Sequence, residues 1–122
     1  MIKELLSRNL IEYTEKHNEC ILLDVRTDNE WKTVGKPDGD KLGLKTYFLS
    51  IKDNLGSINE NFLNDFENLE IGKNIEIAII CRSGMRSALA ANILSKANYK
   101  CINVIDGFEG NDGWLNLGLP AK

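Results

Sequence analysis

The chain has 122 residues, a length typical of one domain that buries its core without disulfide support, and we expect a single domain over residues 1–122. Its 43% hydrophobic and 27% charged residues are typical of an ordinary globular protein and argue against disorder or a fibre. The formal net charge of -3 argues against general nucleic-acid binding, which requires a basic surface.

Helical and strand patterns alternate along the chain without a linker, repeat or low-complexity tract. The predicted elements are, in chain order, a helix over residues 7–18, a strand over 20–25, a short helix over 29–34, a loop over 35–43, an extended segment over 45–51, a helix over 60–69, a strand over 75–80, a helix over 87–98 and a strand over 101–105. Ser7, Asp28 and Asn59 are the expected N-caps of the first three helices. Strands that alternate with helices usually lie parallel and are covered on both faces, so the pattern predicts an α/β fold.

The stretch IAIICRSGMRSALAANIL ends an apolar strand in a thiol, Cys81, directly before a new helix. Gly84 can adopt a positive φ, which lets successive backbone N–H groups turn inward around an anion. The helix that begins near Arg86 or Ser87 directs its positive end at the same place. In open α/β sheets ligands bind at the carboxyl ends of strands, where Asp24 also stands, so we expect the two strand ends to be neighbours.

The surroundings of Cys81 are those of a reactive cysteine. Helix N-termini and neighbouring cations lower the pKa of a cysteine from about 8.5 to about 3.5–7.5, so we predict a nucleophilic thiolate. Cys20 and Cys101 begin strands among Ile and Leu and are predicted to be buried hydrophobic residues. Three cysteines without CxxC spacing predict neither a disulfide framework nor a zinc site, and we expect no metal or organic cofactor. His17, the single histidine, is expected to face solvent.

Three stretches, LLDVRTDNEW, CRSGMRSALAA and VIDGFEGNDGWLNLGLP, together resemble the rhodanese-like sulfurtransferase domains. The resemblance spans nearly the whole chain and implies a rhodanese-like fold, with a central, mostly parallel sheet and helices on both faces. It further implies that Cys81 accepts a sulfane sulfur as a persulfide, from a small sulfur-containing anion such as thiosulfate. The sulfur would then pass to a thiophilic acceptor, which could be a thiol, cyanide or a protein.

The resemblance also assigns roles around Cys81. The backbone N–H groups of the loop and the first helical turn would hold the persulfide or a bound oxyanion, with positive potential from the two arginines; these residues are Arg82, Ser83, Gly84, Met85, Arg86 and Ser87. The supporting residues expected from the early motif are Asp24, Arg26 and Glu30. A structural ion-pair and capping cluster beneath the loop is an equally good interpretation of those three.

Two stretches depart from the family pattern. Residues 35–48 form part of a segment that is longer than the corresponding family stretch and lacks its histidine. The ending GFEGNDGW replaces a plain double glycine before the tryptophan, so Glu109 or Asp112 is expected to give the site an acidic rim. Both departures bear on the choice of substrate.

Two alternatives to sulfur transfer remain open from the sequence. A cysteine-based phosphatase or arsenate reductase also places a thiolate, a loop of N–H donors and an arginine at a helix N-terminus. Four residues separate Cys81 from Arg86, however, whereas the phosphatase signature has five. The other alternative is a non-catalytic sulfur-carrier or partner-binding module, which the intact thiol makes less favourable.

The sequence also bears on location. No apolar run approaches the roughly 18–20 residues that span a bilayer, and the first residues show no signal-peptide pattern. We therefore expect a cytoplasmic protein that binds neither membrane nor nucleic acid.

Overall fold

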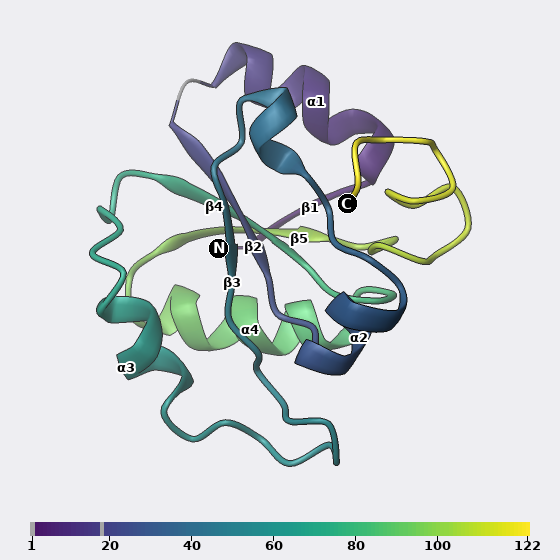
Figure 1. Ribbon diagram of the computed structural model, residues 1–122. Helices are drawn as coiled ribbons and strands as arrows, with labels where there is room; N and C mark the ends of the chain where they lie inside the picture. Colours follow the sequence, from purple (N-terminus) through teal and green to yellow (C-terminus); the bar gives the residue numbers. More distant parts are fainter. Residues whose placement is uncertain (1, 18) are drawn as a thin grey trace.

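The computed structural model describes residues 2–17 and 19–122, and its strands form one all-parallel sheet in the order β1-β5-β4-β2-β3 (Figure 1). The strands are β1 (Ile2–Leu5), β2 (Cys20–Asp24), β3 (Thr46–Phe48), β4 (Glu76–Ile80) and β5 (Lys100–Val104). The helices are α1 (Ser7–Lys16), α2 (Asp28–Thr33), α3 (Phe62–Glu67) and α4 (Met85–Lys96), with a 3-10 turn at Gly39–Leu42. The predicted α/β fold with a parallel sheet is confirmed.

Both faces of the sheet are covered, and each face has its own hydrophobic core. Side chains alternate along each strand, so neighbouring residues of one strand enter different cores. On β4, Ile77 and Ile79 pack against side chains of α3 and α4. Ala78 and Ile80 lie in the opposite core, with side chains of α1 and of the C-terminal segment. Full burial of one isoleucine contributes about 1.5–3 kcal/mol, so a strand buried on both faces anchors the residue that follows it. That residue is Cys81.

The N-terminal strand was not predicted. β1 pairs with β5 at the edge of the sheet, and the register places Ile2 opposite Cys101. Its four residues are only partly covered or exposed, so no apolar run marks them in the sequence. The backbone pairing that makes this segment a strand depends on β5, which is distant in the chain.

The three expected N-cap residues were wrong, although the helices lie close to their predicted positions. Leu6 is the N-cap of α1, and Ser7 instead lies inside the helix. The N-cap of α2 is Thr27 and not Asp28, because Thr27 forms a reciprocal capping box with Glu30.

The expected third helix is also shorter than its sequence pattern. Asn59 lies two residues before Asn61, which is the N-cap of α3, and the Asn59 side chain accepts a hydrogen bond from the N–H of Asn61. In the last helix, α4 begins at Met85, just before the expected start. Asn18, the last residue of the first predicted helix, lies outside the described residues.

The predicted loop over residues 35–43 contains the 3-10 turn, and Pro37 forms an antiparallel bridge with Ala121 near the C-terminus. The extended segment predicted over 45–51 is confirmed in part, because it contains β3. The carbonyl of Gly35 accepts a hydrogen bond from Arg26 at 2.8 Å, which ties the start of the predicted loop to the end of β2.

Within residues 2–17 and 19–122, every helix is too short or too polar to cross a lipid bilayer.

Candidate active site

Cys81 lies immediately after β4, at the carboxyl end of the strand in the middle of the sheet. Its Sγ accepts a hydrogen bond from the backbone N–H of Gly84 at 3.1 Å. Gly84 has a φ of +101° and is the N-cap of α4, so the positive end of this helix faces the sulfur. Cys81 is 1% exposed. The loop therefore encloses the thiol where a negative charge on sulfur is stabilised.

The chain after β5 holds the loop in this position. The N–H of Phe108 donates to the carbonyl of Cys81 at 2.8 Å. The N–H of Glu109 donates to the carbonyl of Arg82 at 3.0 Å. Gly107, with a φ of +66°, lies so close that a Cβ there would overlap the Arg82 carbonyl and stand 2.7 Å from the backbone nitrogen of Ser83. The close approach of the two segments therefore requires a residue without a side chain.

A buried polar network on the other side of Cys81 includes Ser87 and Asn103. The Ser87 Oγ lies 3.3 Å from the Cys81 Sγ and donates to the Asn103 Oδ1 at 2.6 Å. The Asn103 amide donates in turn to the carbonyl of Gly84 at 3.2 Å. With its proton on Asn103, the Ser87 hydroxyl accepts a hydrogen bond from the thiol form of Cys81. Sequence reasoning did not single out Asn103, although one polar residue within the apolar strand CINVI was a usable signal.

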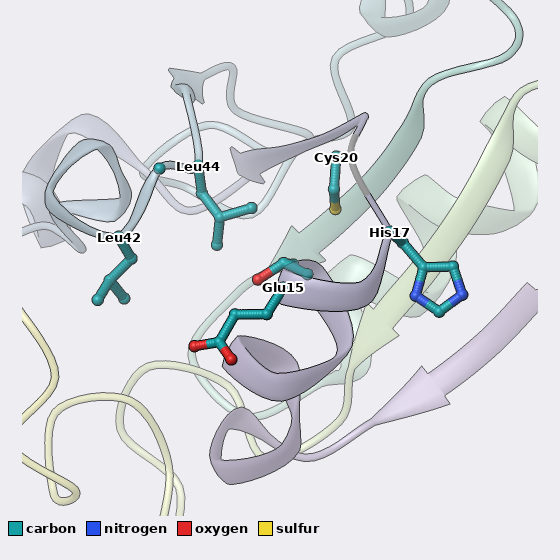
Figure 2. Close-up of a pocket in the computed structure, with 7 residues that line it drawn as sticks. Glu15, His17, Cys20, Leu42 and Leu44 are labelled. Atoms are coloured by element: carbon teal, nitrogen blue, oxygen red, sulfur yellow. The ribbon is translucent and has the colours of Figure 1, made fainter.

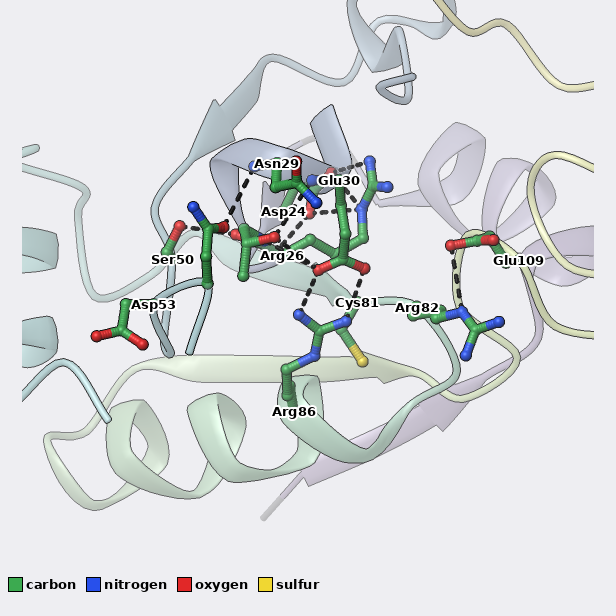
Figure 3. Close-up of polar contacts among 12 residues, drawn as sticks. Asp24, Arg26, Asn29, Glu30, Ser50, Asp53, Cys81, Arg82, Arg86 and Glu109 are labelled. Carbon is green, nitrogen blue, oxygen red and sulfur yellow. Dashed lines mark hydrogen bonds and ion pairs between the residues drawn. The ribbon is translucent and has the colours of Figure 1, made fainter. Parts of the chain in front are cut away.

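Arg86 reaches from α4 to α2, where it binds Glu30 in a bidentate ion pair (Figure 3). The two N–O distances are 2.6 and 2.9 Å. Burial raises the pKa of Glu30, but hydrogen bonds from Arg86 and Thr27 outweigh it and bring the pKa to about 2. The hydrogen bond to Glu30 raises the pKa of Arg86. The guanidinium therefore connects the start of α4 to α2.

Asp24 and Arg26 form a fully buried ion pair at the end of β2. The Asp24 carboxylate accepts hydrogen bonds from the N–H, Nε and Nη2 of Arg26 at 2.9–3.1 Å. Burial raises the pKa of Asp24, and the bonds from Arg26 act against that rise. The guanidinium also lies over the ring of Phe108, 4.2 Å from its centroid. These contacts fit the structural role weighed for the two residues.

The outer part of the loop faces solvent. Arg82 pairs with Glu109 at 3.3 Å, with 65% of the Arg82 side chain and 24% of the Glu109 side chain exposed (Figure 3). Ser83 and Met85 are also exposed, Met85 to 82%. Of the two expected rim carboxylates, Glu109 contacts the loop, whereas Asp112 is exposed with a φ of +57°.

A second cysteine, Cys20, lies beside a hollow at the amino ends of the strands, opposite the end where Cys81 lies. This hollow, of about 200 Å³, is lined by Cys20, His17 and residues 42–44, among others (Figure 2). Because the strands are parallel, the start of β2 lies far from the end of β4 where Cys81 stands. Burial raises the pKa of Cys20 to about 12 and that of Cys101 to about 11, so neither is a thiolate near neutral pH.

The described residues contain no group of three His, Cys, Asp or Glu side chains that could hold a metal ion. His17 is exposed, as expected, and its ring stacks on Tyr13 with centroids 3.9 Å apart. The chemistry-bearing groups around Cys81 are therefore the loop backbone, Ser87 and the paired arginines.

Comparison with known proteins identifies the family. The family model of the Rhodanese-like domain matches residues 6–114. An uncharacterized protein of Rickettsia prowazekii is 44% identical over 110 residues, covering 85% of this chain and 84% of its own length. The putative sulfurtransferase YtwF of Bacillus subtilis is 31% identical over 112 residues, 92% of each chain.

A solved structure agrees with this assignment. The crystal structure of Rv0390 from M. tuberculosis has a TM-score of 0.87 and 31% sequence identity, and the match covers 98% of this chain and 96% of that one. Because the family match spans most of the sequence and the fold agrees over nearly all of it, this chain belongs to the rhodanese-like domain family.

Proposed function

We propose that this protein is a sulfurtransferase that carries a sulfane sulfur as a persulfide on Cys81. The observation that carries the proposal is the hydrogen bond from the Gly84 N–H to the Cys81 Sγ, at 3.1 Å, at the N-terminus of α4. A helix N-terminus favours an anionic sulfur, which is the nucleophilic form of cysteine. A 31% identical relative named as a putative sulfurtransferase adds support.

The reaction needs two displacements at sulfur and no net oxidation. The Cys81 thiolate attacks the outer sulfur of thiosulfate, the S–S bond of the donor breaks, and sulfite leaves with the bonding electron pair. The product is a Cys81 persulfide with one negative charge on its outer sulfur. A thiophilic acceptor such as cyanide then attacks that outer sulfur, which releases thiocyanate and regenerates the thiolate.

Because the thiol is enclosed, the loop around it must move before a donor can reach the sulfur. Cys81 is 1% exposed, so a donor reaches its sulfur only after the outer loop has shifted. Arg82, Ser83 and Met85 are the exposed residues of that loop, whereas Cys81 and Ser87 at its two ends are buried. We expect the middle of the loop to open while its ends stay anchored to the chain after β5 and to α4.

The pairing of Arg86 weighs against phosphatase or arsenate reductase chemistry. Cysteine-dependent phosphoryl transfer needs an arginine that contacts the transferred group, because catalysis depends on positioning and charge stabilisation. Both terminal nitrogens of Arg86 bind Glu30 instead. Arg86 is thus occupied as a link between helices, and the four-residue spacing from Cys81 makes a tight ring of donors that would crowd a tetrahedral phosphate.

Intact-protein mass spectrometry tests the proposal. The reduced protein is incubated with thiosulfate, and we expect one added sulfur atom, which cyanide removes as thiocyanate. The variant Cys81→Ser should gain none, whereas Cys20→Ser should behave as the wild type because its thiol is not the acceptor. Addition that persists in Cys81→Ser, or no addition with any sulfane donor, would contradict the assignment.

Turnover assays separate the alternatives. We expect thiocyanate formation from thiosulfate and cyanide that Cys81→Ala abolishes, with no hydrolysis of an aryl phosphate and no reduction of arsenate. Robust hydrolysis of the aryl phosphate by the unaltered protein would favour the phosphatase hypothesis. Inactivity in every assay together with tight capture of a protein partner would favour the binding module.

A further inference from the structure

The arginines around Cys81, which we call the Cys81 cluster, are Arg26, Arg82 and Arg86, and each of them is paired with a carboxylate. The pairs are Arg26 with Asp24 at 2.9 Å, Arg82 with Glu109 at 3.3 Å and Arg86 with Glu30 at 2.6 Å. The charges within each pair cancel at a distance, so these arginines add no net positive charge near the thiol. The attraction for an anion then comes from the N-terminus of α4 and the loop N–H groups.

The pair between Arg82 and Glu109 differs from the other two because it faces solvent. The Asp24 pair is fully buried and the Glu30 pair about one-fifth exposed, so both act as supports beneath the loop. Arg82 follows Cys81 directly, and 65% of its side chain is exposed to solvent. It is the arginine of the cluster that is best placed to meet an incoming anion.

Glu109 is held against the loop by its backbone as well as by its side chain. Its N–H donates to the carbonyl of Arg82 at 3.0 Å, and its carboxylate contacts the Arg82 Nε at 3.3 Å. With 24% of its side chain exposed, this carboxylate is the more enclosed partner. A negative charge is therefore fixed beside Arg82, the cation that would otherwise attract a donor.

We propose that Glu109 is a specificity-determining residue, which neutralises Arg82 and so removes the preference that this arginine would give the thiosulfate dianion over a sulfane-sulfur donor with one negative charge. The inference rests on the proposed sulfur transfer. Coulomb energy is proportional to the charge on the donor, so Arg82 alone would attract a dianion twice as strongly as a monoanion, and Glu109 cancels that difference. Alkyl persulfides and thiosulfonates are the donors that gain from this, because each carries a single negative charge at the reacting end.

Two matched donors test this selectivity. Thiosulfate and methanethiosulfonate present the same outer sulfur, but a methyl group replaces one anionic oxygen in the second. Attack by Cys81 releases sulfite from the first and methanesulfinate from the second, and both leave the same persulfide. With cyanide as acceptor, kcat/KM is measured for both donors at low ionic strength, where surface charges act most strongly.

The variant Glu109→Gln removes the fixed charge and leaves Arg82 unpaired. Because the interaction energy doubles with the donor charge, the fold-change with thiosulfate should be about the square of that with methanethiosulfonate, and we expect kcat/KM to rise about 5-fold and about 2-fold, respectively. Arg82→Gln should change both values in the opposite direction, and the double variant should restore the wild-type ratio. Added salt should reduce the effect of Glu109→Gln.

Glu12→Gln is the matched control, because it removes the same charge from an exposed ion pair with Lys16 on α1. It should leave the ratio of the two donors unchanged. A ratio that Glu109→Gln does not alter, or alters no more than Glu12→Gln does, would overturn the inference while sulfur transfer itself stands. Absence of a Cys81 persulfide with both donors would refute the proposed function and the inference with it.

Discussion

The ion pair between Glu30 and Arg86 makes the stability of the fold depend on pH. Burial raises the pKa of Glu30, but hydrogen bonds from Arg86 and Thr27 outweigh it and lower the pKa from 4.5 to about 2. That difference corresponds to about 3 kcal/mol, and solvent screening of a partly exposed pair reduces the expected contribution to about 1–2 kcal/mol. Because the pKa is lowered in the folded state, this contribution is complete above pH 4.5 and is lost as the pH falls towards 2.

The variant Glu30→Gln isolates this charge. Glutamine at the third position of a helix preserves a capping box, so the contacts with Thr27 can remain. Urea unfolding followed by circular dichroism should show a loss of about 1–2 kcal/mol at about pH 7. The difference from the wild type should shrink as the pH is lowered to about 3, because unfolded wild type then binds a proton at Glu30, whose pKa is 4.5, whereas the folded state holds its charge down to about pH 2.

Glu12→Gln serves as the control here as well. Its carboxylate is 70% exposed and pairs with Lys16 on the surface of α1, so we expect no measurable change in stability. A difference between Glu30→Gln and the wild type that stays the same at both pH values would refute the reasoning. So would a Glu30→Gln variant as stable as Glu12→Gln.

Removal of the other partner tests whether Arg86 acts in structure or in chemistry. Arg86→Ala leaves the carboxylate of Glu30 half-buried without its cation, which should cost about 1–3 kcal/mol of unfolding free energy. We expect persulfide formation on Cys81 to continue at conditions where the variant stays folded. Loss of persulfide formation without loss of stability would instead assign Arg86 a chemical role.

Two further predictions concern the loop and the thiols. Gly107→Ala should destabilise the fold by about 3 kcal/mol or more in urea unfolding, because the new Cβ overlaps the backbone of the Cys81 loop. Gly56→Ala, at a φ of +86° with open space around it, should cost only about 1 kcal/mol, and equal losses would contradict the packing argument. Iodoacetamide at neutral pH should add one carbamidomethyl group, located on Cys81 by peptide mass spectrometry. Burial raises the pKa of Cys20 to about 12 and of Cys101 to about 11, so labelling of either before Cys81 would contradict the assignment of the reactive thiol.

Local sequence signals were sufficient to predict the alternation of strands and helices and the position of Cys81 between them. The apolar run before Cys81 and the alanine-rich run after it set a strand and a helix on either side of a glycine turn. These signals depend on residues that are adjacent in the chain, so they can be recognised in a single sequence. The family resemblance was carried by three short stretches, one of which begins at Cys81.

The partners of the charged residues were decided only by the tertiary structure. Glu30 and Arg86 are 56 residues apart in the chain, and the sequence left open whether Arg86 faces a substrate or a carboxylate. Asn103 joins the site because β5 lies beside β4, which brings its amide to the carbonyl of Gly84.

The edge strand β1 was missed for the same reason. Its four residues carry no apolar run, and they become a strand only because the exposed edge of β5 offers backbone groups for pairing. Spacing within the chain thus predicted the candidate nucleophile and the positions of most elements. The packing of distant segments determined which charged side chains form ion pairs. An ion pair needs two oppositely charged side chains close together in space, and the order of residues in the chain does not by itself show which side chains will be close.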